Sequence, residues 1–344
     1  MPNRYDVVRQ EMAATPRVWL VTGVAGFIGS NLLDELLRLG QTVVGLDNFS
    51  TGHQANLDEV LATHPESRTR FRMIGGDIRD PEVCRNACES VDIVLHQAAL
   101  GSVPRSVDDP ITSTQVNVDG FLQVLVAARD AGAKRVVYAS SSSVYGDASA
   151  LPQREDRIGR PLSPYAATKA TNELFAGVFH RTYGLGVIGL RYFNVFGRRQ
   201  DPEGPYAAVI PRWVASLLHG EPCRIHGDGE TSRDFCHVSN AVEANLLAAV
   251  APSDASGEAY NVACNESTSL NELFALLREK LSRYRPDVAR AQPIHDGFRP
   301  GDVRHSMADV DKARRKLGYE PITRISSGLE EALEWYAATA KRPS

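Results

Sequence analysis

Residues 17–29 read RVWLVTGVAGFIG, and this stretch decides the fold class of the 344-residue chain. Its first half is an apolar, β-branched run that is typical of a buried strand. Its second half spaces Gly23, Gly26 and Gly29 so that the chain can turn tightly and its N–H groups can approach a phosphate at a helix N-terminus. A helical pattern then runs to a glycine at residue 40. The stretch therefore predicts the strand–turn–helix unit of a nucleotide-binding fold.

Strand and helix patterns alternate from this unit to about residue 193. Further strands are predicted at residues 42–47, 71–77, 92–99, 134–141 and 186–193, and long helical segments at 111–131 and 164–183. Because the strands are apolar on both faces, helices must cover both sides of a parallel sheet. The fold class is therefore α/β, with a Rossmann-type doubly wound parallel sheet.

The pattern loosens after residue 193, where Pro and Gly become frequent and the helices become short. We expect residues 1–16 to form an N-terminal extension and residues 17–193 to form the NAD-binding domain. Residues 194–344 should form mainly a smaller α/β lobe that binds the substrate. Segments near 237–262 and 303–309 are expected to return to the first domain.

The composition excludes several classes of protein. A net charge of −4 gives no general affinity for nucleic acid or an anionic membrane. The five cysteines lack the spacing of a zinc site and are typical of buried thiols in a reducing compartment. The N-terminus lacks the apolar core of a signal peptide, and no apolar run reaches the ~18 residues of a membrane helix. We expect a soluble cytoplasmic protein without a metal.

The acidic residue that ends the second strand identifies the expected cofactor. Asp47 follows the glycines by about twenty residues, where a carboxylate accepts hydrogen bonds from the adenosine ribose and repels a 2′-phosphate. The cofactor is therefore expected to be NAD rather than NADP; the alternative is that the glycines serve only helix–sheet packing. Further cofactor contacts are expected at the following strand ends and helix start: Phe27, Ile28, Asn48, Asp77, Ile78, Gln97, Ala98, Ala99 and Tyr192.

A catalytic pair is predicted on the helix at residues 164–183. Tyr165 and Lys169 are four residues apart and so share one helix face, where the ammonium group favours the phenolate form of the tyrosine. Four serines, residues 140–143, stand where the strand at 134–141 ends. The combination of the glycine turn, the serines and this pair is more specific than any one of them.

At this point the chain resembles the extended short-chain dehydrogenase/reductase family, and among its members those that modify nucleotide sugars. The resemblance covers residues 17–340 and rests on these segments: GVAGFIG (23–29), DN (47–48), GGDI (75–78), HQAA (96–99), SSSSVYG (140–146), YAATK (165–169), RYFNVFG (191–197), RDF (233–235) and RPGD (299–302). It implies that Tyr165, as phenolate, removes the proton from the sugar O4 while C4 gives a hydride to NAD⁺. Lys169 would hold the nicotinamide ribose, and Ser141 would steady O4, with Ser142 and Ser143 facing the same cleft.

The same resemblance favours one reaction over its relatives. Members that dehydrate or decarboxylate a sugar carry acids directly after the catalytic hydroxyl, whereas this chain has Ser142 and Ser143 there. Without a second acid–base group, oxidation and re-reduction at C4 remain, which is epimerisation. The alternatives that stay open are a dehydratase or decarboxylase, a simple dehydrogenase, and a non-catalytic NAD-binding protein.

The resemblance also implies a UDP-sugar substrate. Arg233 and Arg299 match positions that hold the diphosphate, and Asp302 matches one that holds a ribose hydroxyl; the alternative for the last two is a surface ion pair. The remaining positions expected to contact the substrate are Gly101, Ser102, Asn194, Ala208, Val209 and Ser306.

The size of the pocket residues then indicates which sugar is bound. Ser306 stands where galactose-type epimerases often have a bulky aromatic residue, so it leaves room for an N-acetyl group. The chain therefore looks most like bacterial UDP-N-acetylglucosamine 4-epimerases of polysaccharide synthesis, with UDP-uronic acid 4-epimerases as the alternative. Members of the family usually form homodimers through the helices that match 111–131 and 164–183.

Overall fold

The computed structural model describes residues 3–202, 207–298 and 304–339. Its main sheet has seven strands in the order β11-β6-β5-β4-β1-β2-β3, and every neighbouring pair is parallel. The strands are β1 (Val18–Thr22), β2 (Thr42–Asp47), β3 (Phe71–Gly75), β4 (Ile93–His96), β5 (Arg135–Ser141), β6 (Val187–Tyr192) and β11 (Glu258–Val262). The prediction of an α/β doubly wound sheet is confirmed. The strand order reverses between β1 and β4, which is where such sheets bind their ligands.

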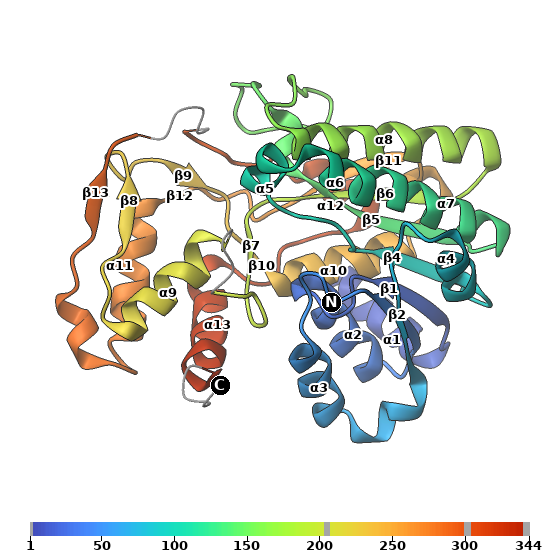
Figure 1. Ribbon diagram of the computed structural model, residues 1–344, viewed down its shortest axis with the longest axis horizontal. Coiled ribbons are helices and arrows are strands. Elements are labelled where there is room, and N and C mark those ends of the chain that lie inside the picture. Colours follow the sequence, from blue (N-terminus) through green and yellow to red (C-terminus); the bar gives the residue numbers. More distant parts are fainter. Residues whose placement is uncertain (1–2, 203–206, 299–303, 340–344) are drawn as a thin grey trace.

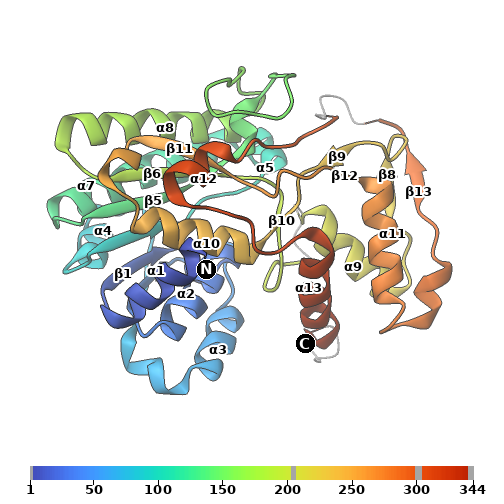
Figure 2. The same ribbon diagram turned by 180° about the vertical axis from the view of Figure 1, so that it is seen from behind.

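Helices cover both faces of this sheet (Figures 1 and 2). On one face lie α1 (Arg4–Ala14), α2 (Phe27–Arg38), α3 (Gln54–Thr63), α10 (Val238–Ala249) and α12 (Asp311–Leu317). On the other lie α4 (Pro81–Cys88), α5 (Val103–Asp108), α6 (Pro110–Thr114), a π-helical turn η2 (Gln115–Asp119), α7 (Gly120–Asp130) and α8 (Pro164–Tyr183). Each face has its own apolar core, one with Leu33 and Leu246 fully buried and the other with Phe121 and Val124. Burial on both faces explains the unbroken apolar strands.

The remaining elements form a smaller lobe beside the sheet (Figure 1, left). They are β7 (Val195–Phe196), α9 (Val209–His219), β8 (Arg224–His226), β9 (Ser232–Arg233), β10 (Cys236–His237), β12 (Thr268–Ser269), α11 (Leu270–Leu281), β13 (Ile294–Asp296) and α13 (Ile325–Thr339). A third apolar core, with Trp213, Phe274 and Tyr336, holds this lobe together. We propose that the sheet with its helices is the cofactor domain and that the smaller lobe binds the substrate, with α10 and β11 belonging to the cofactor domain.

Short helical turns complete the described chain. They are η1 (Pro65–Arg70), η3 (Ser142–Tyr145), η4 (Ser253–Ala255) and η5 (Pro286–Arg290). Within the described ranges, none of the helices combines the length and the apolarity that a bilayer-spanning segment requires.

Candidate active site

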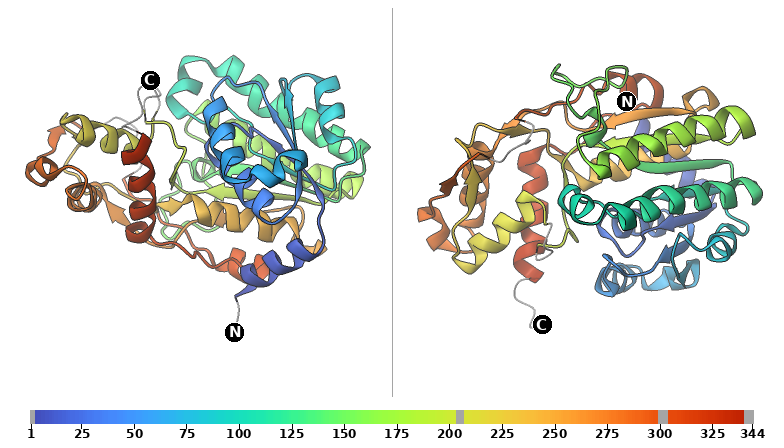
Figure 3. Two further views of the ribbon diagram at one scale, coloured as in Figure 1. Left: turned by 90° about the horizontal axis from the view of Figure 1, so that it is seen from below. Right: turned by 45° about the horizontal axis from the view of Figure 1, so that its top comes forward.

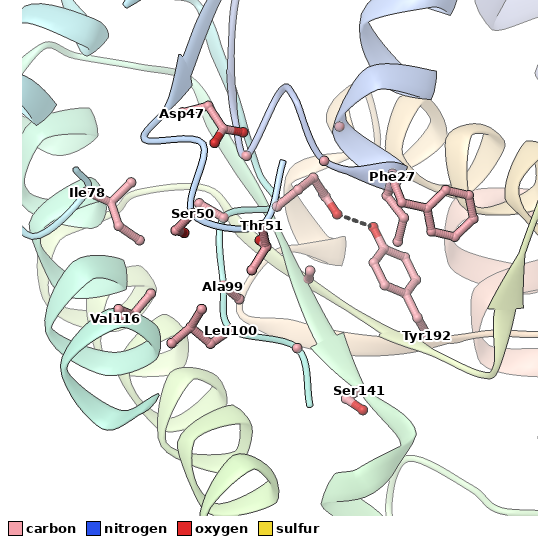
Figure 4. A pocket seen from close by; sticks show the side chains of 18 of the residues that line it. Phe27, Asp47, Ser50, Thr51, Ile78, Ala99, Leu100, Val116, Ser141 and Tyr192 are labelled. Atoms are coloured by element: carbon pink, nitrogen blue, oxygen red, sulfur yellow. Dashed lines mark hydrogen bonds between the residues drawn. The ribbon is translucent and has the colours of Figure 1, made fainter. Parts of the chain in front are cut away.

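A cavity of about 520 Å³ opens at the carboxyl ends of β1 and β4, where the strand order reverses. Predicted site residues that line it are Gly23, Gly26, Phe27, Ile28, Gly29, Asp47, Asn48, Asp77, Ile78, Gln97, Ala98, Ala99, Gly101, Ser141, Ser142, Tyr165, Lys169, Tyr192 and Asn194. Figure 4 shows Asp47 and Ser141 at opposite ends of the labelled side chains. Asp47 and Ser141 therefore line different parts of the cavity.

The glycine turn, residues 23–29, packs its backbone closely against other backbone segments. Gly23 has φ +68°, and an added Cβ there would lie 2.8 Å from the amide nitrogen of Ala98. A Cβ on Gly29 would lie 2.0 Å from the carbonyl oxygen of Gly23. Gly26 precedes α2 and has no side chain to cap it, so the helix N-terminus faces the cavity with its N–H groups available for an anion. The glycines thus allow close packing of backbone on backbone and leave the first N–H groups of α2 open to the cavity.

Two carboxylates line the cavity near the ends of β2 and β3. Asp47 is 8% exposed, and its two oxygens accept hydrogen bonds from the backbone N–H groups of Ala25 (2.9 Å) and Phe49 (2.8 Å). Asp77 is held by Arg79, whose Nε and Nη2 lie 3.0 and 2.7 Å from its oxygens. These hydrogen bonds lower the pKa of Asp77 to about 2, so it is ionised at neutral pH. Both groups can accept hydrogen bonds from an adenosine.

The end of β4 is fixed by a closed ring of three hydrogen bonds. The hydroxyl of Tyr192 donates to Oε1 of Gln97 at 3.1 Å, which is the dashed contact at Tyr192 in Figure 4. Nε2 of Gln97 donates to Asn245 on α10 at 3.1 Å, and Asn245 donates back to the hydroxyl of Tyr192 at 2.7 Å. Asn245 is fully buried and was not predicted. The ring holds one wall of the cavity in a single arrangement.

Tyr165 and Lys169 project from the first turns of α8, which begins at Pro164 and is capped by the side chain of Ser163 (3.1 Å to the N–H of Ala166). Lys169 is 2% exposed, and its Nζ donates to the carbonyl oxygen of Ala139 at 2.9 Å. Burial lowers the pKa of Lys169 to about 8. The Nζ lies 5.8 Å from the centroid of the Tyr165 ring. Helix spacing therefore brings the two groups together, as predicted.

The environment of Tyr165 differs from the expectation in one respect. Desolvation by the surrounding protein raises its pKa, and a side-chain hydrogen bond with Ser141 opposes this shift. The surroundings of Tyr165 therefore favour the phenol, and the neighbouring ammonium does not overcome the effect of burial.

A buried polar network lies directly behind the serines. Glu173, one turn after Lys169 on α8, forms an ion pair with Arg191 on β6 and accepts a hydrogen bond from Ser140 at 2.6 Å. Arg191 also donates to the hydroxyl of Tyr145 at 3.0 Å. Sequence reasoning missed these residues because nothing local marks Glu173 or Arg191 as partners. The network connects the helix of Tyr165 to the strand that carries the serines.

Other predicted residues do not line the described cavity. Ser102 caps α5, and Ser143 Oγ is buried with no partner in the part of the chain that the structure describes. Ala208 and Val209 stand at the start of α9, and Arg233 donates to the carbonyl oxygen of Ser232 at 2.9 Å. Ser306 is buried, 3.4 Å from Oε1 of Gln153. Arg299 and Asp302 lie outside the described residues. The substrate contacts of all these residues stay predictions.

Several cavity-lining residues were missed by sequence reasoning. They are Leu46, Ser50, Thr51, Gly76, Leu100, Val116, Ala139, Ser140, Val195 and Gln200. Ser50 and Thr51 could have been found, because they continue the loop that follows Asp47. Val116 and Gln200 lie on a helical turn and a loop whose approach to the cavity depends on packing.

Comparison with known proteins gives a consistent result. A profile described as the "NAD dependent epimerase/dehydratase family" matches residues 19–263. The chain is 37% identical over 319 residues to a "UDP-glucose 4-epimerase" of Mycolicibacterium smegmatis, covering 92% of this chain and 97% of the relative. It is 32% identical over 320 residues to a "UDP-glucuronate 4-epimerase" of Thermodesulfobacterium geofontis, covering 92% and 95%.

Solved structures agree with this finding. The chain is similar to a UDP-N-acetylglucosamine 4-epimerase of Methanobrevibacter ruminantium solved in complex with UDP-N-acetylmuramic acid, with a TM-score of 0.86 and 37% identity. That superposition covers 94% of this chain and 99% of the other.

Proposed function

The chain belongs to the NAD dependent epimerase/dehydratase family, and from this premise we propose that it interconverts UDP-N-acetylglucosamine and UDP-N-acetylgalactosamine by inverting C4 of the sugar. NAD is its cofactor. Relatives along more than nine-tenths of the chain are named as 4-epimerases of UDP-sugars, which supports this class of reaction. The observation that carries the proposal is the meeting of Ser141, Tyr165 and Lys169 at one end of the cavity.

The residues of the cavity fit NAD. The unobstructed N-terminus of α2 suits the pyrophosphate, and Asp47 suits the adenosine ribose. Bound there, NAD supplies a hydride acceptor that takes hydrogen from C4 of the sugar and later returns it. We assign the proton at O4 to Tyr165, which lines the same cavity as Ser141. Lys169 supplies positive charge beside that phenol, and the positive charge of the cofactor acts in the same direction.

The distribution of carboxylates favours epimerisation over dehydration. Among the residues that line the described cavity, the carboxylates are Asp47 and Asp77, and Asp47 lies far from Ser141 (Figure 4). Ser142 lines the cavity next to Ser141 and has no acidic function. A dehydratase or decarboxylase needs a second acid–base group near the sugar, and this end of the cavity offers hydroxyl groups.

The preference for an N-acetylated sugar is supported by small residues and by one relative. Gly101 lines the cavity, and the position of Ser306 carries no bulky side chain. The similar structure from Methanobrevibacter ruminantium is itself named a UDP-N-acetylglucosamine 4-epimerase. We further propose that Arg233 and Arg299 bind the diphosphate, Asp302 the uridine ribose, and Ala208 and Val209 the uracil.

A UDP-uronic acid is the second candidate substrate. The relative named UDP-glucuronate 4-epimerase, 32% identical, supports it, as does the SSSSVYG segment. Incubating the purified protein separately with UDP-N-acetylglucosamine, UDP-glucose and UDP-glucuronic acid, and following C4 inversion by NMR, tests both candidates. Turnover on the first without net NADH is expected; faster turnover on the uronic acid would replace our proposal by the alternative.

We also propose that the protein forms a homodimer and works in the cytoplasm. Apolar side chains are strongly exposed along α5, α6 and α8: Val107 (62%), Ile111 (71%), Leu174 (72%) and Val178 (43%). These helices contact one another on the outer face of the sheet, where Figure 3 shows α8 and α7 side by side. Covering such a surface with a second copy removes it from water. Five buried free cysteines suit a reducing compartment.

A further inference from the structure

We propose that a cluster of buried and partly buried side chains between the two lobes controls how long NAD stays bound. The cluster consists of Asp34, Glu59, Arg199, Trp335 and Tyr336, and we call it the interlobe clamp. It joins α2 and α3 of the cofactor domain to α13 of the smaller lobe through residues 197–200. This inference depends on NAD binding alone and not on the identity of the sugar.

Arg199 is the centre of the clamp. Its backbone has φ +66°, which a residue with a side chain rarely adopts and which only surrounding contacts can maintain. Its side chain is 1% exposed, and it donates from Nε to Glu59 (3.0 Å) and from Nη2 to Asp34 (3.0 Å). Burial alone would raise the pKa of Asp34, but Arg198, His64 and Arg199 lower it, so the group is ionised. These ion pairs hold the loop after β7 against α2 and α3.

The C-terminal helix completes the clamp from the other lobe. Nε1 of Trp335 donates to Oε2 of Glu59 at 3.0 Å, across 276 positions of sequence. The hydroxyl of Tyr336 lies 3.2 Å from the carbonyl oxygen of Gly197 and 3.0 Å from that of Gln200. One helix of the smaller lobe therefore bonds both to α3 and to the backbone of the loop. The loop cannot move while α13 keeps these hydrogen bonds.

The loop held in this way forms part of the cofactor cavity. Gln200 of this loop lines the cavity, together with Asn194 and Val195 just before the loop, Phe27 and the glycine turn. Asn31, in the second turn of α2, donates to the carbonyl oxygen of Arg198 at 3.2 Å. We place the dinucleotide in the cavity between the glycine turn and this loop, and we infer that one of the two moves when it leaves. The glycine turn packs closely on Gln97 and Ala98, just after β4. We therefore infer that the loop is the part that opens and that the clamp sets how often it opens.

Conservative variants test this inference. Trp335→Phe removes the indole N–H, and Tyr336→Phe removes the hydroxyl, while both keep an aromatic ring in α13. The holoprotein is freed of unbound NAD by gel filtration, mixed with excess isotopically labelled NAD, and the exchange of bound cofactor is followed by mass spectrometry. We expect each variant to exchange NAD about fivefold faster than the wild type, which is the effect of one lost hydrogen bond. The double variant should exchange faster still.

Glu330→Gln is the matched control. Glu330 lies on the same helix but pairs with Lys280, inside the smaller lobe (2.7 Å). This variant should exchange NAD at the wild-type rate, with all variants measured well below their melting temperatures. An unchanged exchange rate in the folded double variant would overturn the inference. So would an equal acceleration by Glu330→Gln, because it would mean that any loosening of α13 releases the cofactor.

Discussion

Glu173 and Arg191 form a two-point ion pair beside the serines that end β5, with Nε 2.9 Å from Oε1 and Nη2 2.7 Å from Oε2. Glu173 belongs to the helix that carries Tyr165 and Lys169, and Arg191 to the neighbouring strand β6. Ser140, the residue before Ser141, donates to the same carboxylate. The pair therefore links the helix of Tyr165, the proposed base, to the strand of Ser141, which is proposed to meet the same oxygen of the sugar.

Replacing Glu173→Gln should destabilise the protein and slow the reaction. The charge of Arg191, whose side chain is 5% exposed, would lose its partner, and breaking a buried pair in this way costs about 3–5 kcal/mol. We expect a lower free energy of urea unfolding and a lower kcat with a smaller change in KM. Glu82→Gln, which removes an exposed pair with Arg85, is the control and should change neither. Equal effects of the two variants would contradict a positioning role for Glu173.

Tyr165→Phe should remove the base while leaving the cofactor site intact. Loss of a general base typically lowers turnover by about 10²–10⁴-fold. C4 epimerisation followed by NMR should fall by this order, and the amount of NAD per protein, measured after heat release, should stay the same. Tyr183→Phe, at the exposed end of the same helix, should leave activity unchanged. Near-normal turnover of Tyr165→Phe would show that another group takes the proton.

Ser306→Tyr should act selectively on N-acetylated substrates. Ser306 is 7% exposed and lies beside Gln153, so the ring of a tyrosine at this position would have to take up space among the residues that surround the serine. We expect kcat/KM for UDP-N-acetylglucosamine to fall at least about tenfold more than that for UDP-glucose. Ser306→Ala keeps the residue small and should preserve the wild-type ratio. The pocket argument fails if the tyrosine variant loses both activities equally.

Burial of Lys169 makes a prediction for the pH dependence of stability. Its pKa is lowered from 10.5 to about 8, so between these values the unfolded chain holds a proton that the folded, NAD-free protein lacks. The free energy of unfolding of the wild type therefore rises with pH across this window. Below pH 8 the folded protein carries the full free-energy cost of the buried ammonium. Lys169→Met removes that cost.

The methionine variant should therefore be more stable than the wild type at pH 7, and its advantage should shrink as the pH rises toward 10. Urea unfolding of the NAD-free proteins at pH 7 and pH 9.5 measures the difference. Lys134→Met, at a side chain that is 74% exposed, is the control and should not gain stability at pH 7. A constant difference between the Lys169 variant and wild type across this range would mean that Lys169 does not titrate there.

The fold and the local parts of the candidate site could be predicted from sequence, because each depends on spacing within a single element. The alternation of apolar strands and helices indicated the parallel sheet, and the glycine turn after β1 indicated a nucleotide site. The four-residue interval between Tyr165 and Lys169 placed both on one helix face, and the structure brings them to the same cavity. The positions of the residues predicted to bind the substrate could not be derived from the sequence, because these residues are dispersed over loops.

Contacts between distant segments were decided only by the tertiary structure. Glu173 contacts Arg191 because α8 packs against β6. Trp335 contacts Glu59, 276 positions away in the sequence, because folding brings the side chains of α13 and α3 together. The rise in the pKa of Tyr165 likewise comes from desolvation by several elements at once. The spacing of residues within one element can be read directly from the sequence. Burial and ion pairing depend on how whole elements pack against one another, and that packing exists only in the folded chain.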